Sequence, residues 1–189
     1  YPSVIDVPSF VDYMLLTELS SNADGYHLST FYHKDRNGKL RAGPLWNFDL
    51  TYGNDLFLWG FDRSKTDVWQ FSNGENDGPG YWKDLFDNSK FRCYLSRRWN
   101  QLTRPGQPFS YQSIELEIDQ IAATISEATV RENTKWGTTG NHGEQIANLK
   151  TFLQQRINWI TNNIGSYSGC DNPEIPPLVI TRINYAPDT

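Results

Sequence analysis

Residues 43–54 read GPLWNFDLTYGN, a stretch in which two polar residues, Asn47 and Asp49, alternate with three large apolar ones. In a half-buried strand alternate residues share one face, so these two polar side chains would point together, away from the apolar side chains. A carboxylate beside a carboxamide suits either a turn cap or a site for a hard cation. The rest of the sequence bears on which of these interpretations holds.

The composition is that of a globular domain with one hydrophobic core: 189 residues, 38% hydrophobic and 21% charged. A net charge of -5 without a basic stripe argues against nucleic acid as a partner. No apolar run reaches the roughly 18 residues that indicate a transmembrane helix, and residues 1–10 lack the features of a signal peptide. We therefore expect no transmembrane segment, and a chain cut or processed from a longer protein.

Apolar periodicity predicts a mainly helical α+β domain, opening with a buried helix over residues 7–21. The dipeptide Asn37-Gly38 between two short extended runs predicts a β-hairpin, and residues 51–80 read as a long ordered loop or lid. Three further apolar stripes predict helices that face the core. These stripes are Phe91, Tyr94, Leu95, Trp99 and Leu102; Ile114, Ile118, Ile121 and Ile125; and Ile146, Leu149, Phe152, Leu153, Ile157, Ile160 and Ile164.

The domain organisation follows from the proline-rich end of the chain. We expect one domain over residues 1–168, a Pro-rich linker over 169–177, and the first strand of a truncated following domain over 178–189. A bridge between Cys93 and Cys170 would pin the exit from the last helix in an oxidising compartment. Two unconnected thiols, one of them buried, are the alternative.

Two acidic residues are candidates for the chemistry. Asp24 lies in the loop after the first helix and Asp49 follows the hairpin, so neighbouring connections can bring both carboxyl groups to one cleft. Phosphoryl transfer needs a carboxylate that orients the attacking hydroxyl and oxygen ligands that hold Mg²⁺, for which Asn47 offers a neutral oxygen. Spacing alone favours a simpler interpretation, in which Asp24-Gly25 is a turn dipeptide and Asp49 caps its own loop.

The order of motifs resembles a known family. N-x-D-G-Y, then S-T-F-Y-H-K, G-K-L-R-A-G-P, W-N-F-D-L-x-Y-G-N and a final helix with L-K-x-F-L-x-x-R-I-x-W-I follow one another over residues 8–165. This order is similar to the spore coat protein H (CotH) kinase family. The resemblance implies the C-terminal lobe of an atypical protein-kinase-like fold, Mg²⁺ and ATP as cofactors, and Ser of secreted or coat proteins as acceptor. It also implies a bacterial protein that is secreted or held at the cell surface, including the spore coat.

Further implications of the resemblance concern the flanking regions. The run LVITRINYAP within residues 178–189 resembles the opening strand of a lamin-tail-type domain. Nothing in the chain reads as the Gly-rich loop or the strand lysine with which kinases hold ATP phosphates, so we expect these parts in a lobe that precedes residue 1.

Residue by residue, the resemblance gives Asp24 the catalytic role of orienting or deprotonating the acceptor hydroxyl. Asn47 and Asp49 match the family's W-D-x-D or W-D-x-N pair, which binds the metal and the cofactor. Ser29 stands where typical kinases carry a second metal-binding Asn. Asn47 and Ser29 depart from the usual pattern, and exchange of Asp for Asn removes one charge from a hard-cation site, so we expect weakened Mg²⁺ binding.

Other polar residues give weaker signals. Arg156 matches an arginine usual in the family, and it either pairs with an acid or packs its stem and bridges locally. His27, His33 and His142 have no Cys or Ser companion at a spacing typical of a catalytic triad, which favours surface positions.

A competing hypothesis is a catalytically inactive secreted module that binds carbohydrate or a surface protein. Its binding surface would be formed by aromatic residues in and around the long loop, namely Tyr52, Trp59, Trp69, Tyr81 and Trp82. A row of rings facing solvent favours this hypothesis, whereas inward-facing rings indicate ordinary core packing.

Overall fold

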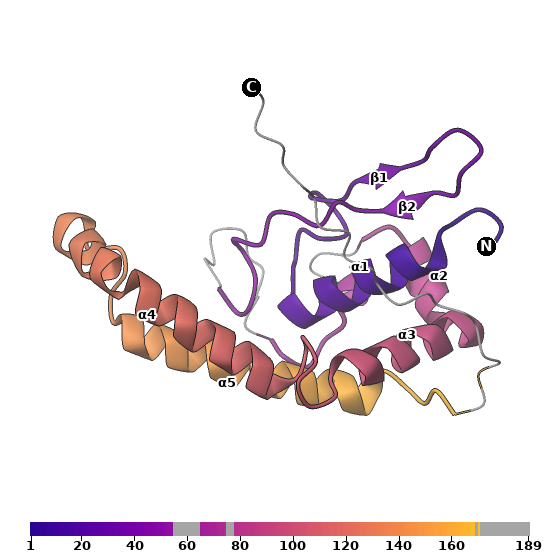
Figure 1. Cartoon of the computed structure of the whole chain (residues 1–189). Helices are drawn as coiled ribbons and strands as arrows, with labels where there is room; N and C mark the ends of the chain where they lie inside the picture. The colour runs from indigo at the N-terminus through magenta and orange to yellow at the C-terminus, as the bar shows by residue number, and fades with distance from the viewer. Residues whose placement is uncertain (55–64, 75–77, 169, 171–189) are drawn as a thin grey trace, which may run out of the picture.

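The computed structural model describes residues 1–54, 65–74, 78–168 and 170. Within these residues the chain forms five α-helices, one 3₁₀ helix and one two-stranded antiparallel sheet (Figure 1). The elements are α1 Val7–Ser20, β1 Tyr32–His33, β2 Arg41–Ala42, η1 Gln70–Ser72, α2 Tyr81–Asp87, α3 Ser89–Leu102, α4 Tyr111–Trp136 and α5 His142–Asn163. The expected mainly helical α+β fold with a small hairpin is confirmed.

The core forms around α1, which packs against β2, α3 and α5. The helix begins where the Asp6 carboxylate accepts a hydrogen bond from the Ser9 backbone N–H at 3.3 Å, a standard N-cap. It ends at Ser21, whose positive φ of 52° turns the chain away. Nine of its residues are buried: Phe10, Val11, Tyr13, Met14, Leu15, Thr17, Glu18, Leu19 and Ser20. The predicted buried first helix is therefore confirmed.

The hairpin pairs Tyr32 with Ala42 and His33 with Arg41. Asn37 reverses the chain between the strands with a φ of 64°, a conformation that Asn tolerates better than most residues. The hairpin predicted from Asn37-Gly38 is confirmed.

The segment after β2 differs from the expected strand. Residues 43–48 have no regular secondary structure, and Asn47 has a φ of 60°, in the left-handed region. A residue in that region breaks the simple alternation of faces, because only extended backbone alternates side chains regularly. Trp46 is exposed and contacts Phe31 in a tilted arrangement, with ring centroids 5.4 Å apart.

The expected loop over residues 51–80 is only partly described. Within its described residues, η1 is the one regular helix or strand. Residues 55–64 and 75–77, which include Trp59, lie outside the described residues.

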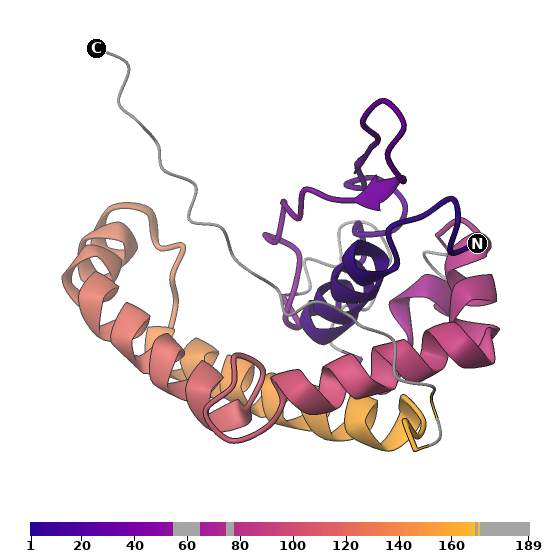
Figure 2. The same ribbon diagram turned by 45° about the vertical axis from the view of Figure 1, so that its right-hand side comes forward.

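Helix α4 and the N-terminal part of α5 form an arm that extends beyond the rest of the fold (Figures 1 and 2), whereas the C-terminal part of α5 belongs to the core. No residue of α4 is buried. Ile114 and Ile118 pack against the core, whereas Ile121 and Ile125 are exposed. The expectation that this stripe faces the core along its length is therefore wrong, because α4 has only one long neighbour, α5, on which to bury it.

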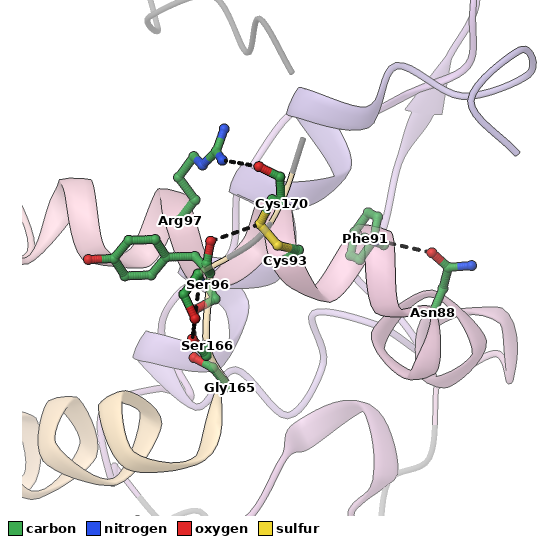
Figure 3. Close-up of a disulfide and its surroundings, with 10 residues drawn as sticks. Asn88, Phe91, Cys93, Ser96, Arg97, Gly165, Ser166 and Cys170 are labelled. Atoms are coloured by element: carbon green, nitrogen blue, oxygen red, sulfur yellow. Dashed lines mark hydrogen bonds between the residues drawn. A yellow bond between two sulfur atoms is a disulfide. The ribbon is translucent and has the colours of Figure 1, made fainter. Parts of the chain in front are cut away.

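A disulfide joins Cys93 in α3 to Cys170, with Cα atoms 6.0 Å apart (Figure 3). Around it, the Ser96 hydroxyl donates to the Gly165 carbonyl at 2.6 Å and the Arg97 guanidinium donates to the Cys170 carbonyl at 3.1 Å. The bridge that the sequence left open is thus present, and it fixes the exit of α5 on α3. The expected linker and following strand over residues 171–189 lie outside the described residues.

No helix in the described part of the chain combines the length and apolar character needed to cross a membrane.

Candidate functional site

The loop after α1 is organised by Asn22, a buried residue. Its side-chain nitrogen donates to the Asn47 carbonyl at 3.0 Å, and its side-chain oxygen accepts from the Asp24 backbone N–H at 3.1 Å. One carboxamide therefore joins the two segments that carry the candidate residues. Both bonds connect a buried group to backbone, so their loss would leave polar groups without partners.

Ser29 and Asn47 are in direct contact. The Asn47 side-chain nitrogen donates to the Ser29 hydroxyl at 3.3 Å, and the Ser29 backbone N–H donates to the Asp24 carbonyl at 2.8 Å. Together with Asn22, these bonds place Asp24, Ser29 and Asn47 in one hydrogen-bonded network. The structure thus brings together three of the four site residues that the sequence indicates.

Asp49 lies apart from this network and is exposed. Its backbone carbonyl accepts a hydrogen bond from the Asn54 side chain at 2.7 Å, while its carboxylate makes no hydrogen bond or ion pair with the described residues. The carboxylate is thus not the cap of its own loop. It lines a cleft between residues 48–54 and α5.

The loop that carries Asp24 is held against α1 by close packing of its backbone at Gly25. The Tyr13 hydroxyl donates to the Gly25 carbonyl at 2.5 Å, and the Thr30 hydroxyl donates to the same carbonyl at 2.7 Å. A Cβ atom at Gly25 would lie 2.6 Å from Cγ2 of Thr17. The glycine of the N-x-D-G-Y motif therefore allows the loop to lie directly on α1.

A buried ion pair supports the same loop. The Arg156 guanidinium donates to the Glu18 carboxylate at 2.9 Å and to the Glu18 carbonyl at 2.8 Å. The backbone N–H groups of Gln70 and Phe71 also donate to this carboxylate, at 2.9 and 3.2 Å. The Gln70 side chain in turn donates to the Ser21 hydroxyl at 2.7 Å, at the start of the loop. Arg156 therefore pairs with an acid, and that acid is not one of the candidate site residues.

Burial raises the pKa of the Glu18 carboxyl, and the positive charge of Arg156 acts in the opposite direction. Burial likewise lowers the pKa of Arg156, opposed by the charge of Glu18. Each residue thus favours the ionised form of its partner, against the effect of burial. The carbonyls of Thr66 and Val68 accept further hydrogen bonds from Arg156, at 2.9 and 2.6 Å.

The donor groups fit a hard cation by type. Asp24 and Asp49 offer carboxylate oxygens, Asn47 a carboxamide oxygen and Ser29 a hydroxyl, the all-oxygen set that Mg²⁺ prefers. The Asn47 nitrogen is engaged by Ser29, which leaves the Asn47 oxygen as a possible ligand. The described residues contain no group of three or more His, Cys, Asp or Glu arranged to hold a metal, so the site is poor in charged ligands.

Some residues of functional interest carry no clear signal in the sequence. Asn22 is part of the N-x-D-G-Y motif. Its side-chain oxygen accepts from the backbone N–H two residues later, a turn that Asn often forms. Glu18 gave no signal, because an acid within an apolar helix is normally exposed. His142, expected at the surface, is half buried and lines the cleft beside Asp49.

The fold and these loops define a mainly helical α+β domain with an oxygen-rich candidate site. A model of the CotH kinase protein family matches residues 1–160. The chain therefore belongs to the CotH kinase protein family, as the motif order indicates. Searches of curated proteins and of solved structures gave no match.

Proposed function

We propose that the chain is part of an Mg²⁺- and ATP-dependent atypical protein kinase that transfers phosphate to a Ser hydroxyl of a secreted or coat protein. The observation that carries the proposal is the network of Asp24, Ser29 and Asn47. Within the described residues, neither the Asp24 nor the Asp49 carboxylate accepts a hydrogen bond, and Asp49 lines the neighbouring cleft. Membership of the CotH kinase protein family supports this assignment.

The residues divide into two roles. Asp24 orients the acceptor hydroxyl and accepts its proton, while Asp49 and Asn47 hold the cation and Ser29 fixes the Asn47 side chain. Mg²⁺, when bound, supplies positive charge that offsets the charge of the phosphates. Because Asn47 is neutral, most of the ligand charge comes from Asp49, so metal affinity depends on that residue.

The Cys93–Cys170 disulfide supports a place outside the cytoplasm, because such bridges persist in oxidising compartments. Secretion or attachment at the bacterial cell surface, including the spore coat, is the localisation we propose.

The test is calorimetric titration of Mg²⁺ with ATP into the natural full-length protein. We expect metal-dependent nucleotide binding that is lost in Asp49→Ala and retained in Asp24→Ala, whereas phosphorylation is lost in both. Asp35→Ala is the matched control, since Asp35 is an exposed acid of the hairpin turn whose hydrogen bond with Gly38 is through its backbone carbonyl. Asn47→Asp should tighten metal binding, because it adds a charged oxygen ligand.

Absence of metal-dependent nucleotide binding in the unmodified protein would overturn the proposal. Equal binding in the unmodified protein and in Asp49→Ala would overturn the assignment of the metal site.

The competing carbohydrate-binding or protein-binding function has less support. Trp82 is buried in contact with Phe10 and Tyr13, and Trp69 packs among Phe71, Phe86 and Trp159. Trp69 and Trp82, two of the rings expected to form the binding surface, therefore face inward. Tyr81 is partly exposed, but its hydroxyl is hydrogen-bonded to that of Tyr32.

A further inference from the structure

A cleft of about 760 Å³ lies between residues 48–54 and residues 142–155 of α5. This volume is within the range of small-ligand sites. Its loop wall is fixed in place, because the Tyr52 backbone N–H donates to the Ser20 carbonyl at 2.7 Å. Gly53 packs so closely on Phe152 that an added Cβ would lie 2.8 Å from the ring. The cleft is thus built from backbone contacts as well as side chains.

The α5 wall of the cleft carries a row of uncharged hydrogen-bonding side chains. Gln145, Asn148 and Gln155 are exposed and line the cleft, and steps of three and seven residues place them on one face of the helix. From His142 to Gln155 the helix rises about 20 Å. An extended peptide of about six residues covers the same length.

The charge of the cleft limits its occupant. Among the described residues that line it, Asp49 is the one acid and none is Lys or Arg. An acidic peptide or a bare phosphate group would therefore meet one like charge and no lysine or arginine from these residues. A neutral or basic segment meets no such penalty.

The side chains also indicate the kind of hydrogen bonds. A carboxamide both donates and accepts, so a row of three can pair with the alternating N–H and C=O groups of an extended backbone. A sugar ring would instead need an exposed aromatic face. Of the three Phe and Tyr rings that line the cleft, Phe152 is buried and Phe48 and Tyr52 are half buried, so none of them presents a fully exposed face.

His142 adds an independent observation. Its Nε2 atom is buried and has no hydrogen-bond partner in the part of the chain that the structure describes. Unpaired buried polar atoms are rare in folded proteins, and His142 lines the cleft. A small turn of its ring toward the cleft would let Nε2 pair with a peptide carbonyl or hydroxyl.

We infer that this cleft binds the acceptor peptide in an extended conformation, with Gln145, Asn148 and Gln155 contacting its backbone and acidic residues disfavoured. The inference rests on the proposed function, because that function makes the bound peptide the phosphate acceptor. Asp49, the proposed metal ligand, lies in the opposite wall, so the peptide would run past the metal site.

The experiment measures fluorescence anisotropy of labelled Ser-centred hexapeptides with the full chain, without ATP or Mg²⁺. The probes are a positional library with uncharged flanking residues, the same frames with Glu flanks, and backbone N-methylated copies of the tightest binder. We expect binding by uncharged frames, at least about tenfold weaker binding by Glu-flanked frames, and none by N-methylated copies. The double variant Gln145→Ala/Asn148→Ala removes about two hydrogen bonds and should weaken binding about tenfold.

Gln154→Ala is the matched control, because Gln154 is an exposed amide of α5 that does not line the cleft. It should bind as the unmodified chain does. All three substituted residues are exposed on a helix, where Ala is well tolerated, and circular dichroism checks that each variant is folded.

Three outcomes would overturn the inference: no binding across the uncharged library, equal affinity in the double variant and the control, or binding of maltohexaose in place of peptides. The two proposals fail separately. Peptide binding that follows the expected pattern, with no metal-dependent nucleotide binding, would remove the kinase function and keep the peptide site. Nucleotide binding without any peptide binding would remove the peptide site and keep the kinase function.

Discussion

Helices α1 and α4 both carry apolar residues at helical spacing, but α1 is the more apolar of the two and their surroundings are opposite. Nine of the 14 residues of α1 are buried, whereas none of the 26 residues of α4 is. The first helix touches β2, α3 and α5, while α4 lies along α5 alone for most of its length (Figure 2). The spacing of apolar residues therefore predicts which face of a helix is covered. The number of neighbouring elements decides how many of those residues are buried.

The same contrast holds for the charged pairs of the two regions. Glu18 and Arg156 meet at 2.9 Å with side chains 1% and 0% exposed, and Lys150 and Asp119 meet at 2.7 Å with side chains 21% and 56% exposed. The two pairs have similar distances but differ in their exposure to solvent. Water screens the attraction between Lys150 and Asp119, whereas it is excluded from Glu18 and Arg156.

The largest expected effect comes from breaking the buried pair. Arg156→Leu leaves the Glu18 carboxylate uncompensated in the core, so we expect unfolding to require about 3–5 kcal/mol less free energy. Urea denaturation followed by circular dichroism measures this loss. The double variant Glu18→Leu/Arg156→Leu should recover part of it, since no buried charge remains. A loss in Arg156→Leu as small as that of a surface substitution would contradict the contrast between the two regions.

The second prediction compares one residue type in the two regions. Ile160 is fully buried, and Ile160→Ala should cost about 2–5 kcal/mol through lost burial and a cavity. Ile125, in α4, is 40% exposed, and Ile125→Ala should cost about 1 kcal/mol or less. The two variants share one denaturation assay. Equal losses would show that the arm is packed as tightly as the core.

The third prediction concerns the buried network beneath the candidate site. Asn22→Ala removes the bonds to the Asn47 carbonyl and the Asp24 N–H, and should cost about 1–3 kcal/mol. Asn22→Asp keeps the side-chain oxygen that accepts from the Asp24 backbone N–H and loses the nitrogen that donates to the Asn47 carbonyl. This variant therefore separates the contributions of the two hydrogen bonds. In calorimetry both variants should weaken Mg²⁺-dependent ATP binding. Unchanged nucleotide binding with reduced stability would make Asn22 purely structural.

The smallest effect is expected for Lys150, the partner of Asp119 at the surface. Lys150→Ala should lower the denaturation midpoint slightly, and 1 M NaCl, where the screening length is about 3 Å, should abolish the difference. The hydrogen bond to Asp119 raises the pKa of Lys150 above 10.5, its ordinary value. A raised pKa means that the contribution is complete at neutral pH and is lost as the pH rises through the folded-state pKa. A difference that persists in high salt would contradict this interpretation.

Much of the fold could be predicted from the sequence, because local patterns determined it. The first helix, the Asn37-Gly38 hairpin and the stripes of α3 and α5 are confirmed. The extended alternation around Asn47 was wrong, since a positive φ at one residue is not visible in a polar–apolar pattern. The exposure of α4 was also missed, because burial depends on which neighbours the tertiary fold provides.

The candidate site was predictable only in part. Asp24, Ser29, Asn47 and Asp49 were indicated by a family resemblance, and the structure joins the first three by hydrogen bonds while Asp49 lies apart. Asn22 and Glu18 were missed because their roles depend on partners 25 and 138 residues away in the chain. Such long-range pairs cannot be inferred from spacing in a single sequence.

The disulfide has a mechanical consequence for any load applied beyond the end of α5. Tension that enters the chain at Cys170 passes through the disulfide directly to Cys93. The segment between these two cysteines, which are 77 positions apart in the sequence, therefore carries no force. Helices α4 and α5 are both inside that shielded loop. Stretching the oxidised protein should release a contour roughly 250–280 Å shorter than stretching the reduced one, so the arm would keep its shape under pull.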